Sequence, residues 1–350
     1  MSEVGERLRA RLRERRRMPF AEFMEEALYG PGGYYAGERF PVGERGDFLT
    51  GSSLPLFAQA TVRLLRSLDS TLGESAELLE IGCGPGSHLA AVEAASPGRR
   101  LRGHDRVARP LAGGVRVAGL EEVAERSVRG LIFSYELFDA LPVHRLVWRE
   151  QGLGELWVAL DEAGAFRFAA GELSSRDLGA LLGDAAPDLA PGQVVDLAPG
   201  WRPLYRALAR RLDRGLLVTC DYGYERPRLL DARVRRHGTL AAYRQHRVHR
   251  DPFADPGEED LTAHVDFTAL REVGEQEGLT TLCFTRLAPW LVACGLFEAL
   301  AGADPATLQD ARRLLDGEGM GHDIRVLAQA RGVDLGALVS NEMAAQLARG

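Results

Sequence analysis

The chain contains no lysine, because all 43 basic residues in its 350 positions are arginines. P-loop nucleotide sites and Schiff-base enzymes of the pyridoxal or aldolase type need a lysine amine. Protein kinases and serine β-lactamases also carry an obligatory lysine in their signatures. The absence of lysine therefore excludes these four classes. The chain also has only three isoleucines and one asparagine, a bias that indicates a GC-rich coding sequence.

Cysteines and long apolar runs are also scarce. The four cysteines form no C-x-x-C pair, which argues against a disulfide framework or structural zinc and favours a reducing, cytoplasmic setting. No apolar run approaches the roughly 20 residues of a membrane-spanning helix. With a formal net charge of −7, we expect no nucleic-acid partner. Glutamates interrupt the arginine-rich start, so it is interpreted as a charged surface helix rather than a transit peptide.

Short apolar segments alternate with amphipathic ones along much of the chain. Strands are expected at residues 77–81, 101–104, 115–118, 131–134, 216–220, 279–285 and 323–330. Helices are expected at residues 3–28, 56–72, 87–95, 201–213, 266–278 and 304–317, and a last one after residue 334. This alternation predicts βαβ units in a doubly wound, largely parallel sheet. Two insertions interrupt it, an antiparallel ribbon within 146–200 and a polar, irregular stretch at 225–265.

A glycine-rich turn is the most informative motif. Residues 78–86 read Leu-Leu-Glu-Ile-Gly-Cys-Gly-Pro-Gly, between an expected strand and an expected helix. Glycines at 82, 84 and 86 let a ligand approach the backbone and face the helix N-terminus. In the dinucleotide fingerprint G-x-G-x-x-G the last glycine would stand where this chain has Ser87. The observed E-x-G-x-G-x-G pattern instead resembles the S-adenosylmethionine motif of class I methyltransferases.

Two acids accompany this turn. Glu80 lies two residues before Gly82, where it can reach the ammonium group of the cofactor directly or through water. Asp105 lies 19 residues after Gly86, at the end of the second expected strand. A carboxylate at that place accepts hydrogen bonds from ribose hydroxyls. We therefore predict a cofactor site formed by Glu80, Gly82, Gly84, Gly86 and Asp105.

An acidic loop follows the strand expected at 131–134. Glu136 and Asp139 are three residues apart and would share a face on a helical turn. Beside a methyl donor, two carboxylates suit a cationic acceptor such as a guanidinium, which they can bind and orient. Deprotonating a free guanidinium is costly because its pKa lies far above neutral pH, so the proton is expected to leave after transfer. The alternative is a helix-capping Asp139 with Glu136 paired to an arginine.

Nearly the whole chain resembles the MidA-type methyltransferases, the family of the mitochondrial complex I assembly-factor arginine methyltransferase and its bacterial relatives. The matching blocks lie at residues 20–24, 28–35, 46–48, 136–142, 221–224, 238–246, 260–267 and 320–321. The chain departs from the family pattern at Tyr135, at 51–55 and at 285–287, where a family asparagine, an acid-containing stretch and a glutamine are missing.

The resemblance implies a Rossmann-like class I methyltransferase fold. This is an α/β sheet, mostly parallel with an antiparallel last strand, plus an N-terminal helical cap and two insertions. It implies S-adenosylmethionine as cofactor and protein-arginine methylation, with a role like complex I assembly. It places Asp47, Glu136, Asp139 and Asp221 at acidic positions facing the site. The expected division is a cap at 1–73, core at 74–145, a ribbon insertion at 146–200, core at 201–224, an insertion at 225–265 and core at 266–350.

Other interpretations remain open at this stage. A small-molecule or RNA methyltransferase, a cofactor-bound assembly chaperone with little turnover, and a nicotinamide enzyme are compatible with the same fold. The histidines at 237, 246, 249 and 264 could bind a metal, but hydrogen-bonded loop histidines are favoured. The arginines between 226 and 250 could contact RNA, although a solvated face or an acidic partner fits the net charge better. The sequence predicts no oligomeric state.

Overall fold

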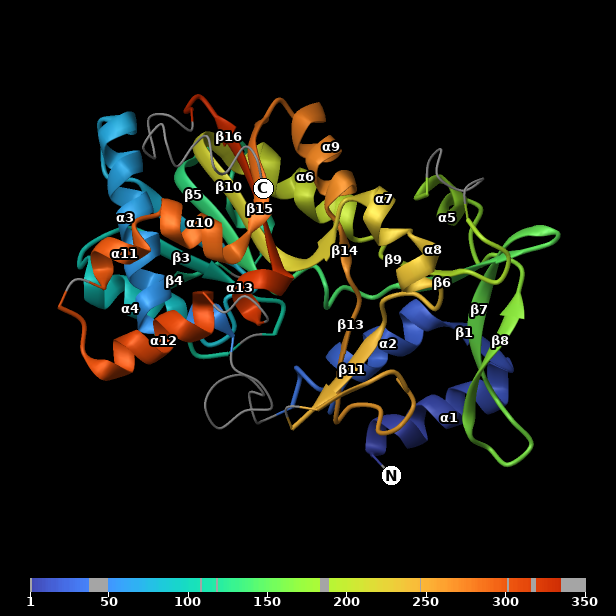
Figure 1. Cartoon of the computed structure of the whole chain (residues 1–350). Helices are drawn as coiled ribbons and strands as arrows, with labels where there is room; N and C mark the ends of the chain where they lie inside the picture. The colour runs from blue at the N-terminus through green and yellow to red at the C-terminus, as the bar shows by residue number, and fades with distance from the viewer. Residues whose placement is uncertain are drawn as a thin grey trace. The chain divides into compact units, whose positions relative to one another are not determined.

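The computed structural model describes residues 2–37, 50–107, 109–117, 119–182, 189–245, 247–300, 302–315 and 319–334 (Figure 1). The chain forms two compact units, each assembled from three segments. The α/β unit comprises Thr50–Leu137, Arg202–Gly223 and Phe267–Gly350. The ribbon unit comprises Met1–Leu49, Phe138–Trp201 and Tyr224–Asp266. These units group residues by spatial contact, and the six-part division expected from the sequence stays a prediction.

The main sheet of the α/β unit follows the strand order β15-β16-β10-β5-β2-β3-β4. Its strands, in chain order, are β2 (Glu77–Ile81), β3 (Leu101–His104), β4 (Val115–Arg116), β5 (Val128–Tyr135), β10 (Leu212–Tyr224), β15 (Thr280–Arg286) and β16 (Ile324–Arg331). The pairs from β10 to β4 are parallel, whereas β16 is antiparallel to both β10 and β15. The predicted fold, mostly parallel with an antiparallel last strand, is therefore confirmed.

Helices cover both faces of this sheet. Helices α3 (Pro55–Leu72) and α4 (Ser87–Ala95) lie on one side, and α6 (Trp201–Arg211) and α9 (Phe267–Gln276) lie on the other (Figure 1). Because helices cover both faces, the middle strands are largely buried, and all five residues of β2 are buried, Glu77 and Glu80 included. The remaining helices of the unit are η1 (Gly51–Ser53), η2 (Leu120–Glu122), α10 (Leu287–Ala293), α11 (Leu296–Ala299), α12 (Pro305–Leu315) and α13 (Met320–Asp323).

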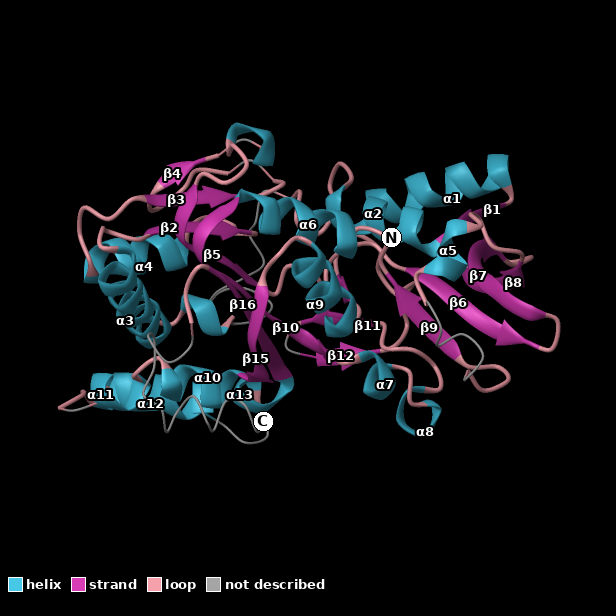
Figure 2. Cartoon of the chain, turned by 90° about the horizontal axis from the view of Figure 1, so that it is seen from above, coloured by secondary structure: helices cyan, strands magenta, loops and turns pink. Residues whose placement is uncertain are grey.

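The ribbon unit contains two antiparallel sheets, whose strands are drawn in magenta in Figure 2. The larger has the order β1-β7-β6-β9, and β8 pairs with β7. Its strands are β1 (Arg17–Pro19), β6 (His144–Arg149), β7 (Gly152–Leu160), β8 (Phe166–Gly171) and β9 (Val194–Leu197). The smaller sheet joins β12 (Arg247–His249), β11 (Ala241–Arg244) and β13 (Asp260–Thr262). The short strand β14 (Val265–Asp266) and the helices α1 (Glu3–Arg15), α2 (Phe20–Tyr29), α5 (Asp177–Ala180), α7 (Arg226–Leu229) and α8 (Ala232–Arg235) complete the unit.

Two sequence-based expectations about this unit were wrong. The single helix predicted at 3–28 is two helices, because Arg16 has a φ of +65° and the next three residues form strand β1. That strand pairs with β7, with Met18 opposite Val158, and this distant partner overrides the local helical pattern. The stretch at 225–265 is more regular than expected, since it contains α7, α8 and the smaller sheet. The ribbon predicted within 146–200 is confirmed by β6, β7 and β8.

In the part of the chain that the structure describes, no helix is both long and apolar enough to cross a membrane.

Candidate functional site

The glycine turn connects β2 to α4, as predicted. Its three glycines all have positive φ angles, +75° at Gly82, +51° at Gly84 and +80° at Gly86. A Cβ atom on Gly86 would lie 2.7 Å from the side chain of Leu111, so the turn has no room for a side chain there. The backbone N–H of Gly82 donates to the carbonyl of His104 (2.8 Å), which fixes the turn to the end of β3.

Glu80 lies on β2 and is buried, with 4% of its surface exposed. Its Oε2 lies 3.1 Å from Nδ1 of His88, on the first turn of α4. His88 Nε2 in turn lies 3.1 Å from the hydroxyl of Thr61 on α3. The sequence prediction missed His88. The available signal was a histidine eight residues after Glu80, among the small and apolar residues that open a helix.

Asp105 follows β3 and faces the turn. One oxygen accepts a hydrogen bond from Gly84 N (2.8 Å) and the other from Val107 N (2.9 Å). A carboxylate has about four acceptor positions, so both oxygens can still accept hydroxyl donors. The ribose-binding role of Asp105 stays a prediction.

Cys83 lies inside the glycine turn, and the pKa of its thiol depends on the charges around it. Burial, together with the carboxylates of Glu80 and Asp105, raises the pKa of its thiol to about 12. Both negative charges are therefore close to the glycine turn. A ligand that carries a positive charge is favoured there.

Two of the predicted acceptor-side acids belong to neighbouring strands of the α/β unit, with Glu136 directly after β5 and Asp221 within β10. Tyr135 on β5 and Cys220 on β10 are partners in the parallel register, so Glu136 and Asp221 occupy the next positions. Asp221 is fully buried, and its oxygens accept from the backbone N–H groups of Leu137 (3.1 Å) and Tyr222 (2.8 Å).

The backbone of Glu136 is in the left-handed region, with a φ of +49°. Its N–H donates to the carbonyl of Cys220 at 2.9 Å. Strained backbone of this kind costs on the order of 1–3 kcal/mol and is concentrated at functional sites. It also means that residues 136–139 do not form the right-handed helical turn considered from the sequence, so Glu136 and Asp139 do not share a helix face.

Tyr135 immediately precedes Glu136 in the chain, and its side chain is buried. Burial raises its pKa well above the ordinary value, and the charge of Glu136 adds to the increase. Its ring packs edge-on against Phe57 with centroids 5.4 Å apart. A Cβ atom on Gly51 would lie 2.3 Å from the Tyr135 hydroxyl oxygen, so this glycine is required by the close contact.

The other two predicted acids are placed differently. Asp139 belongs to the ribbon unit and is 4% exposed, and its carbonyl accepts from Ala263 N (2.9 Å). In the same unit, Tyr35 donates to Asp260 Oδ1 (3.0 Å) and stacks on Tyr29 with centroids 5.6 Å apart. Burial raises the pKa of Tyr35, and the carboxylates of Asp260 and Asp139 add to this. Asp47 lies outside the described residues.

The histidines and arginines of the second insertion have local partners. His249 Nε2 lies 3.1 Å from Glu259, and Arg228 and Arg235 lie over the ring of Tyr224 at 4.7 and 4.0 Å. Among the residues that the structure describes, no group of three or more potential ligands could hold a metal ion. His246 lies outside them.

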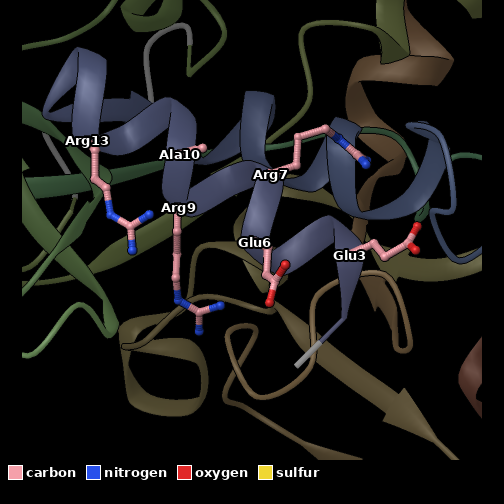
Figure 3. Close-up of a pocket in the computed structure, with 6 residues that line it drawn as sticks. All are labelled: Glu3, Glu6, Arg7, Arg9, Ala10 and Arg13. Atoms are coloured by element: carbon pink, nitrogen blue, oxygen red, sulfur yellow. The ribbon is translucent and has the colours of Figure 1, made fainter.

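A hollow beside α1 is lined by residues of that helix alone (Figure 3). The lining residues are Glu3, Glu6, Arg7, Arg9, Ala10 and Arg13. Arg9 donates to the carbonyl of Gly164 (3.2 Å) and stacks on Phe166 at 4.5 Å, while Arg7 pairs with Glu26 (2.6 Å). The hollow contains none of the predicted site residues. It belongs to the charged surface helix expected from the sequence.

Comparison with known proteins decides the family. A family model of S-adenosyl-L-methionine-dependent methyltransferases matches residues 88–285, more than half of the chain. The chain belongs to this methyltransferase family. The resemblance inferred from the sequence motifs is thereby confirmed, and S-adenosylmethionine is the cofactor.

The relatives of this methyltransferase include curated and solved proteins. A Drosophila melanogaster protein named protein arginine methyltransferase NDUFAF7 homolog, mitochondrial, is 25% identical over 329 residues, covering 80% of this chain and 72% of that protein. The Danio rerio protein arginine methyltransferase NDUFAF7 is 27% identical, covering 73% and 68%. A Burkholderia thailandensis protein crystallised with S-adenosyl-homocysteine is 30% identical with a TM-score of 0.84, covering 95% of this chain and 92% of that chain.

The glycine turn of the methyltransferase fits this cofactor. The turn presents glycine backbone without side chains. The two acids beside it suit the ammonium group and the ribose hydroxyls of the cofactor. When bound, S-adenosylmethionine supplies a methyl group on a positively charged sulfur. The roles of Asp105 toward the ribose hydroxyls, and of Glu80 with the glycine turn toward the amino-acid end, stay predictions from the sequence.

Proposed function

We propose that this methyltransferase transfers a methyl group to an arginine side chain of a partner protein. The observation that carries the proposal is the pair of acids at adjacent register positions of two neighbouring strands, Glu136 directly after β5 and Asp221 within β10. The printed names of the curated relatives support the same acceptor. Burial, Asp221 and Glu136 all contribute to the raised pKa of the Cys220 thiol, which indicates that both carboxylates act on one small region.

The chemistry required of these acids is modest. Replacing an N–H of a guanidinium by N–CH₃ keeps its positive charge and releases one proton. Carboxylates bind a guanidinium through charge-assisted hydrogen bonds and fix which nitrogen faces the methyl group. Because Asp221 is held by two backbone N–H groups, it needs no reorganisation when the acceptor binds. Positioning of this kind is the main contribution that methyl transfer requires.

The test uses the purified chain, S-adenosylmethionine with a tritiated methyl group, and an extract of source cells that lack the gene. The extract is separated into protein, RNA and small-molecule fractions, and the protein is hydrolysed to amino acids. We expect label in methylarginine. Label in RNA or small molecules, or cofactor binding with no label in any fraction, contradicts the proposal.

Matched variants make this test specific to the acid pair. Glu136→Gln and Asp221→Asn remove one charge each while keeping similar shapes. We expect both to bind S-adenosylhomocysteine within about threefold of the parent, because neither residue is assigned to the cofactor. We expect each to lose about 100-fold in labelling rate, the scale of one removed transition-state contact.

A further inference from the structure

Glu80 and His88 form a buried pair beside the glycine turn. Glu80 is 4% exposed and His88 is 3% exposed, and their side chains are 3.1 Å apart. Among the described residues, His88 is the one hydrogen-bond partner of this carboxylate. A buried carboxylate without a donor is strongly unfavourable. His88 therefore decides how the carboxylate of Glu80 is oriented.

The ring of His88 is itself held on its opposite edge. Its Nε2 lies 3.1 Å from the hydroxyl of Thr61, which donates to the carbonyl of Phe57 (3.1 Å) on the same helix. Because both ring nitrogens are engaged, the imidazole cannot turn without losing a hydrogen bond. The rings of Phe57 and Phe133 lie 5.5 and 5.3 Å from it and leave little space for another orientation.

We propose that His88 is a positioning residue for the cofactor. It orients Glu80 toward the α-ammonium group of S-adenosylmethionine, and Thr61 fixes the imidazole in the required orientation. The row Thr61–His88–Glu80 connects α3, α4 and β2, three elements of the α/β unit. His88 acts on the cofactor and not on the acceptor, so the result of the binding test does not depend on whether the enzyme methylates arginine.

A purely packing role for His88 makes a different prediction. If the imidazole only fills space between the two phenylalanines, its loss should affect all ligands of the turn equally. If it orients Glu80, the loss should affect only ligands that carry the ammonium group. Two ligands separate these cases, because S-adenosylhomocysteine has the amino-acid end and 5′-methylthioadenosine lacks it.

The experiment measures the affinity of both ligands by calorimetry for the parent, His88→Leu and His88→Asn. Leucine removes both ring nitrogens, whereas asparagine keeps an N–H donor near the position of Nδ1. We expect His88→Leu to weaken S-adenosylhomocysteine about tenfold, the scale of one charge-assisted hydrogen bond, and 5′-methylthioadenosine less than about twofold. We expect His88→Asn to recover most of the lost affinity.

Equal weakening of both ligands by His88→Leu, unchanged binding of S-adenosylhomocysteine, or no recovery in His88→Asn overturns the proposal. Should His88→Leu fail to fold, Thr61→Val carries the test, because it removes only the hydroxyl. It should weaken S-adenosylhomocysteine about threefold with no effect on 5′-methylthioadenosine. The matched control is Thr71→Val, since Thr71 makes the same bond to a preceding carbonyl of α3 (3.0 Å) without a histidine. An unchanged ratio of the two affinities in Thr61→Val overturns the proposal as well.

Discussion

Gly84 is the middle glycine of the turn. Its φ is +51°, and its N–H donates to Asp105 (2.8 Å). Valine in that conformation costs about 1–2 kcal/mol and moves the backbone that faces the cofactor. We expect Gly84→Val to weaken S-adenosylmethionine at least about 100-fold, or about 3 kcal/mol, in calorimetry.

Gly98 supplies the control for this substitution. It has a φ of +78°, and an added Cβ would meet no atom within 4 Å. Gly98→Val should lose a similar amount of stability in urea unfolding while keeping full affinity for the cofactor. Parent-like binding by Gly84→Val would show that the turn does not hold S-adenosylmethionine.

The contact between Gly51 and Tyr135 predicts a pair of coupled substitutions. Alanine at 51 would place its Cβ 2.3 Å from the tyrosine hydroxyl and 3.2 Å from Cζ. We expect Gly51→Ala to lower the free energy of unfolding by about 1–3 kcal/mol, as overpacking does. Adding Tyr135→Phe removes the closest atom, so the double variant should regain part of the loss in urea unfolding. Strict additivity of the two changes would contradict this contact.

Asp69 connects the end of α3 to the segment before β3 through hydrogen bonds. Its oxygens accept from both terminal nitrogens of Arg99 (2.8 and 2.7 Å) and from Ala76 N (2.6 Å). The hydrogen bond to Arg99 lowers the pKa of Asp69, although burial opposes it. A lowered native pKa stabilises the fold above the unfolded value of about 4 and loses that contribution as the pH falls further.

We therefore expect Asp69→Asn to lower the free energy of unfolding at pH 7 by about 1 kcal/mol, a value reduced for partial solvent screening. The difference should begin to shrink as the pH falls below about 4, and it should approach zero only below the lowered pKa of the native carboxyl. Urea unfolding at pH 7, 5 and 3 measures this. Glu172→Gln is the control, because its carboxylate is 88% exposed. A difference for Asp69→Asn that persists unchanged at pH 3 would contradict the assignment.

The elements whose ends are marked by neighbouring residues in the sequence were predicted with the correct first and last residues. The strands at 77–81 and 101–104 and the helix at 87–95 are bounded by glycine, proline or polar residues, which end an element without help from elsewhere. The helix at 3–28 was wrong because Arg16 lies in a left-handed region and β1 pairs with a strand some 140 residues away. The N-terminal cap predicted at 1–73 likewise gave no indication that β1 joins a sheet formed by distant residues.

The site residues also differ in whether nearby sequence or distant contacts determine their roles. The glycines and Asp105 follow from spacing in one βαβ unit. His88 did not, because its role depends on Glu80 and on Thr61, which lies 27 residues earlier on another helix. The left-handed backbone of Glu136 also escaped prediction, since glutamate carries no preference for that region.

For the whole molecule, the four cysteines make a further prediction. All are buried and free, and burial raises the thiol pKa of each, to about 12 for Cys83 and Cys283. A raised pKa leaves the thiols protonated at pH 8, and protonated buried thiols react slowly. We expect almost no reaction with Ellman's reagent in the native protein within minutes, and four equivalents after unfolding in guanidinium. Rapid reaction of one native thiol would contradict the burial.

The position of β16 in the sheet has a consequence for synthesis. This strand lies between β10 and β15, and β15 has no other partner in the strand order. During translation, β15 leaves the ribosome before the strand that holds it, so it must wait unpaired until residues 324–331 emerge. A ribosome paused before that point holds a sheet in which β10 lacks its β16 partner, with unpaired backbone N–H and C=O groups open to chaperones and to other nascent chains.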